Sequence, residues 1–301
     1  MDRLDGIRVF VAVAEAGGFA AAARSLRMSP PAVTRAVAAL EERIGARLLH
    51  RTTRTVRLTE AGARYLADAK RILAELDEAE ATAAGAHAEP RGLLTVTAPL
   101  LFGRMHVAPV VLDFLARYPE VSARTLFADR VVDLLDEGVD VAVRIAELPD
   151  STLSAVRVGQ VRRVVCAAPG YLAGRGAPSV PRDLESHDCI GFQAGATPAP
   201  WLFPGRSGDG IETVRPPMRL LVNNADVAVA VAVAGRGVTR VLSYQAAEAV
   251  REGRLVVLLA EHEPPPIPVH LVHLEGRRAA ARVRAFVEFA AERLRAVLGA
   301  I

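Results

Sequence analysis

Three arginines recur at every third position near the end of the first fifth of the chain. Arg51, Arg54 and Arg57 are separated by a threonine-rich sequence. Guanidinium groups spaced in this way along a hairpin suit the phosphate oxygens of DNA or a narrowed minor groove. Residues 1–59 contain ten arginines against five acidic residues, a net charge of +5, whereas the whole chain of 301 residues carries +3. Positive charge concentrated at one end is typical of nucleic-acid binding.

Helical patterns precede these arginines. Apolar residues recur at helical spacing over residues 4–14, and a second short pattern covers residues 19–26. Ser29 is the expected N-cap of a third helix, because its hydroxyl can accept a hydrogen bond from a backbone N–H of the first turn, and Pro30 suits the first helical position. Such a helix fits the major groove, so the pattern predicts a helix–turn–helix followed by a wing. The candidate DNA-binding residues are Phe19, Ser29, Pro30, Pro31, Thr34, Arg35, Arg51, Thr53, Arg54 and Arg57.

Residues 60–88 predict a long linker helix, and residues 89–92 predict a hinge because they contain Pro90 and Gly92. Apolar positions in this helix are spaced by three and four residues, as in the seam of a coiled coil. The alternative is an ordinary core helix, but the position between a small basic unit and a large domain favours dimerisation. The expected dimerisation residues are Leu66, Ala69, Leu73 and Leu76.

Strands and helices alternate from residue 93 onward, which predicts an α/β domain with a mostly parallel sheet. Residues 102–118 and 130–137 predict helices, and residues 161–168 predict one buried strand. The glycine- and proline-rich residues 191–217 predict irregular hairpins and loops. The whole chain is therefore expected to be α+β, with an all-α winged helix–turn–helix domain over residues 1–59, a linker helix and an α/β domain.

Residues 10–62 resemble the N-terminal domain of LysR-type transcriptional regulators. One departure is Pro30, where the family often has glutamine; proline has no amide to bind adenine, so base readout is expected to shift to Pro31, Thr34 and Arg35. The matching residues are Phe10, Gly18, Phe19, Ala22, Ala23, Leu26, Ser29, Ala32, Val33, Thr34, Arg35, Leu40, Glu41, Gly45, Leu48, Leu49, Arg51, Arg54, Leu58, Thr59 and Gly62.

The remainder resembles the effector domain of the same regulators, through pattern and through short motifs at residues 140–144 and 235–238. The resemblance implies two α/β lobes like those of periplasmic binding proteins. Lobe I would comprise about residues 93–163 and 264–301, and lobe II about residues 164–263. It also implies a homodimer or homotetramer (a dimer of dimers) on promoter DNA, controlled by a small-molecule effector between the lobes. RNA polymerase is a candidate partner.

Ligands in open α/β sheets bind beyond the carboxyl ends of strands, often at helix starts. Free N–H groups at two helix starts, with Arg144 nearby, would suit a carboxylate. Other roles stay open: Arg144 could pair with an acid, Asn223 could be only a cap, and Trp201 could be a hydrophobic lid. The candidate effector-binding residues are Pro99, Leu100, Leu101, Phe102, Arg144, Trp201, Asn223 and Asn224.

Enzymatic motifs are incomplete. Residues 235–240 begin like a dinucleotide fingerprint, but Arg240 stands in place of the last glycine, and Lys70, the single lysine, follows alanine and not the glycine of a phosphate loop. The sequence therefore predicts a protein that is not an enzyme and that needs no cofactor.

The two cysteines and the seven histidines could in principle serve redox sensing or metal binding. Cys166 lies in a buried-strand pattern, and a redox-sensing regulator that uses Cys166 or Cys189 is the alternative function. His270 and His273 flank a strand but are expected to be structural, so no metal site is expected. No apolar run is long enough for a transmembrane helix or a signal core, which predicts a cytoplasmic protein without a membrane partner.

Overall fold

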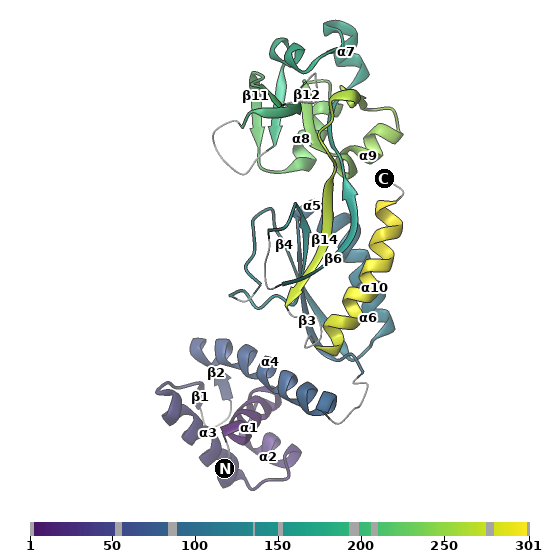
Figure 1. Cartoon of the computed structure of the whole chain (residues 1–301). Coiled ribbons are helices and arrows are strands. Elements are labelled where there is room, and N and C mark those ends of the chain that lie inside the picture. Colours follow the sequence, from purple (N-terminus) through teal and green to yellow (C-terminus); the bar gives the residue numbers. More distant parts are fainter. Residues whose placement is uncertain are drawn as a thin grey trace. The chain divides into compact units, whose positions relative to one another are not determined.

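The structure is a computed structural model that describes residues 3–51, 56–83, 89–134, 136–149, 153–192, 199–205, 210–274 and 280–299. The chain divides into two compact units, Met1–Glu89 and Pro90–Ile301 (Figure 1). Each unit has hydrophobic cores of its own. In the described part of the chain no single helix is long and apolar enough to cross a membrane; the first two helices reach that length only together, and they are bent by 118° at their junction.

The first unit is a winged helix–turn–helix with a long helix attached, as predicted. A left-handed glycine, Gly45 with φ of +73°, ends the third helix, and its N–H donates to the carbonyl of Glu41. Phe10, Val37 and Leu40 form the centre of the core. The elements are α1 (Arg3–Ala16), α2 (Phe19–Ser25), α3 (Pro30–Ile44), β1 (Leu49–Arg51), β2 (Val56–Leu58) and α4 (Glu60–Ala83).

The second unit contains two five-stranded sheets, one in each lobe. The sheet of lobe I has the order β4-β3-β5-β14-β6, and the sheet of lobe II has the order β11-β8-β12-β7-β13. Their strands are β3 (Gly92–Ala98), β4 (Val121–Phe127), β5 (Val141–Ile145), β6 (Leu153–Val161), β7 (Arg163–Ala167), β8 (Cys189–Phe192), β11 (Met218–Val222), β12 (Val238–Leu242), β13 (Val256–Leu258) and β14 (Ile267–Leu274). A separate hairpin in lobe II consists of β9 (Trp201–Pro204) and β10 (Ile211–Val214).

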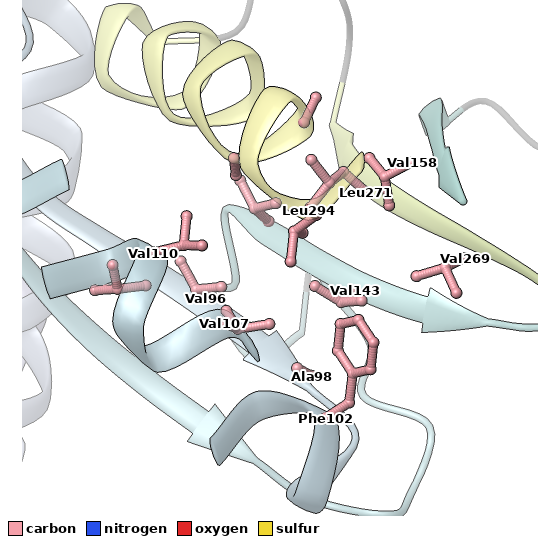
Figure 2. Packing of buried hydrophobic residues seen from close by; sticks show 14 of the residues in the cluster. Val96, Ala98, Phe102, Val107, Val110, Val143, Val158, Val269, Leu271 and Leu294 are labelled. Carbon is pink, nitrogen blue, oxygen red and sulfur yellow. The ribbon is translucent and has the colours of Figure 1, made fainter. Parts of the chain in front are cut away.

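Helices cover these sheets. They are α5 (Leu100–Phe102), a π-helical turn η1 (Gly103–Val107), α6 (Ala108–Arg117), α7 (Pro169–Arg175), α8 (Ala225–Val233), α9 (Ser243–Arg251) and α10 (Ala281–Leu298), with 3-10 turns η2 (Pro181–Ser186) and η3 (Ala260–His262). In lobe I, α6 and α10 pack side by side (Figure 1). Figure 2 shows how Val107, Val110 and Leu294 from the helical segments meet Val143 and Leu271 from the sheet.

The sheets are mixed, so the prediction of a mostly parallel sheet was wrong. In each sheet, two neighbouring pairs are parallel and two are antiparallel. The antiparallel pairs in lobe I arise because the chain leaves that lobe along β6 and returns along β14, which inserts between β5 and β6. The single strand predicted over residues 161–168 is in fact the end of β6 followed by β7 in the other lobe.

Two predicted helices also differ from the structure. Residues 130–137, where described, form turns and no helix, because Asp133 accepts the N–H of Asp136 at 3.0 Å and Arg130 pairs with Glu137 through two hydrogen bonds of 2.6 and 2.5 Å. The helix predicted over residues 102–118 is interrupted by η1, directly before Pro109, which has no N–H to donate.

Candidate nucleic-acid interface and effector cavity

The N-terminus of α3 is built from backbone atoms alone. Ser29 occupies the N-cap position, but its hydroxyl makes no capping hydrogen bond, contrary to the prediction. Its carbonyl instead accepts the N–H groups of Ala32 at 2.9 Å and Val33 at 3.1 Å. Pro30 and Pro31 fill the first two helical positions and have no N–H groups, and the N–H of Ala32 at the third position is taken by the Ser29 carbonyl.

Most of the predicted base-reading residues are exposed on α3. Ser29, Pro30, Pro31 and Arg35 are exposed, and Thr34 is half-buried. The Thr34 hydroxyl donates to the Pro30 carbonyl at 3.0 Å. Phe19, by contrast, begins α2 and packs partly against the core of the unit.

The predicted wing is an antiparallel hairpin of β1 and β2, in which His50 lies opposite Arg57 and Arg51 lies opposite Val56. The side chain of Arg57 is exposed. Thr53 and Arg54 lie outside the described residues.

A buried carboxylate joins this hairpin to α3, and the sequence analysis gave it no role. Glu41 is only 8% exposed, and its Oε1 accepts the N–H groups of Leu48 at 2.8 Å and Leu49 at 3.0 Å. The two ends of the hairpin are also tied together, because the hydroxyl of Thr59 donates to the carbonyl of Arg47 at 2.8 Å. The hairpin is therefore held in a fixed position on the helix that precedes it. An acid on the apolar stripe of α3, one helical turn after Val37, is the signal that could have revealed this role.

The four predicted dimerisation residues lie on α4, and most of them also serve the core of their own unit. Ala69 is 1% exposed in that core, and Leu66 and Leu73 pack partly against it. Leu76 is half-buried. Their role in assembly stays a prediction.

A cavity of about 290 Å³ lies between the two lobes of the second unit. Lobe I contributes the carboxyl ends of β3 and β5 and the segment after β4, and lobe II contributes β8, the end of β12 and the start of α9. The lining residues are Thr97, Ala98, Pro99, Ala128, Asp129, Arg130, Val131, Val132, Val143, Arg144, Ile145, Ala146, Phe192, Leu242, Tyr244 and Gln245.

Only two of the predicted effector-binding residues, Pro99 and Arg144, line this cavity. Leu101 and Phe102 are buried in the core of lobe I, and Leu100 is 41% exposed. Trp201 is 7% exposed in a core on the far side of the lobe II sheet from α8, with Phe203 and Val214, because it belongs to the β9–β10 hairpin. Asn223 is exposed, and Asn224 caps α8.

At each of the two helix starts, one N–H group that was expected to be free is already bound. The Leu100 N–H donates to Oδ1 of Asp129 at 3.0 Å, and the Asp226 N–H donates to Oδ1 of Asn224 at 2.8 Å. Asp129 thus occupies the place proposed for a ligand carboxylate at the start of α5. The role of Asp129 could not be predicted from local sequence, because it lies in a loop 29 residues from its partner.

Arg144 is the remaining cationic group with spare donors in the cavity. It donates one hydrogen bond to the carbonyl of Val132, while Arg130, the other lining arginine, is engaged by Glu137. A guanidinium has five N–H donors. Tyr244 and Gln245 bond to each other at 3.1 Å, and burial raises the pKa of Tyr244 to about 12, so its hydroxyl stays protonated.

Two contacts join the lobes beside the cavity. The Tyr244 ring, from lobe II, packs in the lobe I core against Phe102, with ring centroids 5.2 Å apart and planes at 88°. Arg104 in η1 forms an ion pair of 3.0 Å with Asp226 in α8. The lobes that form the walls of the cavity are therefore also in direct contact with each other.

The cysteines do not favour the redox alternative. Cys166 and Cys189 are both fully buried, and burial raises the pKa of each thiol to about 12. They lie on opposite faces of the lobe II sheet, one in the core beneath α8 and one in the core beside Trp201. A bond between them would have to cross the sheet. Among the described residues, no group of three or more His, Cys, Asp or Glu side chains could hold a metal ion.

Comparison with known proteins agrees with this architecture. Residues 4–63 match the family model of the bacterial regulatory helix-turn-helix protein, lysR family, and residues 87–295 match the LysR substrate binding domain. An HTH-type transcriptional repressor of Pseudomonas aeruginosa is 34% identical over 97% of this chain and 92% of its own length. The transcriptional regulator CrgA of Neisseria meningitidis is 32% identical over 96% of each chain.

Solved structures show the same fold. The structure of CrgA, a LysR-type transcriptional regulator, has a TM-score of 0.61 and covers 98% of this chain and 99% of its own, at 32% identity. The full-length structure of the Vibrio cholerae virulence activator AphB has a TM-score of 0.61 at 23% identity, over 97% of this chain and 99% of its own. These relatives are regulators and not enzymes. The chain therefore belongs to the LysR family of transcriptional regulators, with a DNA-binding helix–turn–helix unit and a substrate-binding effector domain.

Proposed function

We propose that this LysR-type regulator is controlled by a small organic monocarboxylate bound in the cavity between its two lobes. The observation that supports the proposal is the cavity itself, about 290 Å³ in volume and lined from both lobes, with Arg144 in a wall of both apolar and polar side chains. On the DNA side, α3 would enter the major groove and the arginines of the wing would contact phosphates. The active form would be a homodimer or homotetramer joined through α4.

The chemistry of the lining supports a single carboxylate on an apolar body. Arg144 can form charge-assisted hydrogen bonds with a carboxylate, because one of its donors is used by a described residue, the carbonyl of Val132. Val131, Val143 and Phe192 supply apolar surface. Asp129 adds a negative charge to the same wall, which would repel a second carboxylate on the ligand.

Control follows from contact with both lobes. A ligand that touches lobe I and lobe II stabilises the arrangement in which both contacts are made, and it shifts the population toward that arrangement. Because the proposed assembly holds DNA at two or more half-sites, such a shift would change the binding or bending of the promoter.

The test is binding of the full-length protein to a panel of aliphatic and aromatic monocarboxylic acids, measured by thermal shift and by affinity for DNA upstream of its own gene. An acid at about 100 times its Kd should add about 2.7 kcal/mol to the free energy of unfolding. Arg144→Gln should weaken acid binding at least tenfold, because a hydrogen bond to a charged group contributes about 1.5–3 kcal/mol. The melting temperature without acid should fall slightly, because the hydrogen bond from Arg144 to the carbonyl of Val132 is lost.

The matched control is Arg117→Gln, which removes an exposed arginine at the end of α6, outside the cavity lining. It should bind acids as the parent does. Acid binding by Arg144→Gln at parental affinity would contradict the assigned role of Arg144.

A further inference from the structure

The walls of the cavity between the lobes carry both signs of charge. The charged side chains that line it are Asp129, Arg130 and Arg144. Arg130 is neutralised within lobe I, because two hydrogen bonds join its guanidinium to the carboxylate of Glu137. Asp129 and Arg144, by contrast, form no ion pair with each other or with any other residue that the structure describes. The cavity therefore offers a ligand one carboxylate and one guanidinium.

Both of these charged groups keep unused hydrogen-bonding capacity. Oδ1 of Asp129 accepts the N–H of Leu100 at 3.0 Å, which leaves Oδ2 without a donor among the described residues. Arg144 donates to the carbonyl of Val132, and a guanidinium has five N–H donors. Removal of an ionised group from water is costly unless a partner replaces the water, so a ligand that fills the cavity needs a partner for each charge.

The charge of Asp129 also acts on the wall that lobe II contributes. Burial is the main cause of the raised pKa of Tyr244, and the negative charges of Asp129 and Asp226 add to the increase. Tyr244 begins the lobe II side of the cavity together with Gln245. Asp129 therefore lies within electrostatic reach of a ligand that is held between the two lobes.

The cavity lining calls for three features in one ligand: a negative group for Arg144, a positive group for Asp129, and an apolar body for Val131, Val143 and Phe192. A plain carboxylic acid supplies only two of these features, and Asp129 repels it. We infer that the effector is a zwitterion, an apolar amino acid whose carboxylate binds Arg144 and whose ammonium group binds Asp129. This inference rests on the proposed function, and it adds the class of monocarboxylate that the cavity selects.

The experiment compares pairs of ligands that differ only in the amino group. The full-length protein is titrated by calorimetry with each apolar proteinogenic amino acid and with the matching acid that lacks the amino group, such as leucine and 4-methylpentanoic acid. For the pairs that bind, the amino acid should bind at least tenfold more tightly. The reason is that its ammonium group forms a charge-assisted hydrogen bond with Asp129 and offsets the repulsion between Asp129 and the ligand carboxylate.

Asp129→Asn separates the charge of this side chain from its shape, because it keeps the oxygen that accepts the N–H of Leu100. The variant should weaken the binding of amino acids at least tenfold and strengthen the binding of plain acids, since it removes the partner of the ammonium group and the repulsion of the carboxylate. A merely structural defect would weaken both sets of ligands. Glu120→Gln removes an exposed carboxylate outside the cavity lining, and as the matched control it should leave all affinities unchanged.

Two outcomes would overturn the inference. If plain acids bind to the parent as tightly as their amino counterparts, or if Asp129→Asn keeps the parental preference, the ammonium group is not recognised by Asp129, and the proposed function stands without this detail. If neither amino acids nor plain acids bind, both the inference and the proposed monocarboxylate effector are wrong.

Discussion

Burial keeps the two cysteine thiols of lobe II neutral at ordinary pH. Cys166 lies in β7 and Cys189 in β8, both at 0% exposure, and desolvation is the main cause of their raised pKa values. A neutral thiol is a poor nucleophile, so both cysteines should react slowly with thiol reagents and peroxide in the folded protein. Both cysteines therefore act as small side chains of the hydrophobic cores.

The raised pKa values predict a loss of stability at alkaline pH. Each thiol ionises near pH 9 in the unfolded chain but only near pH 12 in the folded protein. Unfolding therefore releases protons above pH 9, so the stability present below pH 9 falls as the pH rises toward 12. At pH 10 the expected loss is about 1.4 kcal/mol for each cysteine, measured by urea unfolding between pH 8 and 10.

Cys166→Ala and Cys189→Ala should each remove the contribution of one thiol, so the free energy of unfolding should fall less between pH 8 and pH 10 than in the parent. This holds even if the substitution lowers the free energy of unfolding at pH 8. A free energy of unfolding that is flat from pH 8 to pH 10 in the parent would contradict the assigned pKa values.

At the residue scale, the exposure of side chains in the first unit could be predicted better than its buried contacts. The exposed positions of Pro30, Pro31 and Arg35 follow from helical spacing, which depends only on local sequence, and their contact with DNA stays a prediction. Glu41 was not, because its two hydrogen bonds join residues seven and eight positions away. Asp129 was missed for the same reason, since the N–H it binds lies 29 residues away.

The helix α4 packs one side against the core of its own unit, and its other side is the proposed dimer contact. It begins at Glu60 after a true side-chain cap, in which Thr59 accepts the N–H of Gly62 at 2.9 Å. One side packs Ala69 and Leu73 into the core of the DNA-binding unit. Ile72, by contrast, is 42% exposed. A dimer contact made by α4 must use an apolar residue that is not already buried, and Ile72 fits that need.

Ile72→Asp should therefore weaken the dimer with little change in the melting temperature of the monomer, because it places a carboxylate in the proposed contact. Leu73→Asp is the comparison, and it should lower the melting temperature as well, since Leu73 packs against the core. Sedimentation velocity at low micromolar concentration distinguishes the two. Parental sedimentation of Ile72→Asp would exclude Ile72 from the contact.

At the element scale, long periodic segments such as α1, α3 and α10 could be predicted from sequence because one face of each meets a core. Strand order could not, because β14 inserts between β5 and β6 only after the chain has passed through lobe II. The prediction of a helix over residues 130–137 was wrong. In this segment the Asp133 side chain accepts a backbone N–H, and the Arg130 side chain bonds to that of Glu137.

At the scale of the effector domain, the two lobes are joined by contacts of unequal strength. The ion pair of Arg104 and Asp226 is solvent-exposed, with 66% and 42% of the side chains accessible, and such pairs contribute about 0–1 kcal/mol. Tyr244 is 1% exposed and lies in the core of the opposite lobe. Packing should therefore hold the lobes together, and charge should contribute little.

Calorimetry of three variants tests whether the packing of Tyr244 holds the lobes together more strongly than the ion pair does. Asp226→Asn should leave one cooperative transition of the effector domain with nearly parental melting temperature. Tyr244→Ala should cost about 3–5 kcal/mol, as for other large buried aromatic side chains, and should separate the melting of lobe I from that of lobe II. Tyr244→Phe retains the ring against Phe102 and should retain the single transition. If Asp226→Asn separates the lobes and Tyr244→Ala does not, the exposed ion pair is the main link, and cavity closure would depend strongly on salt.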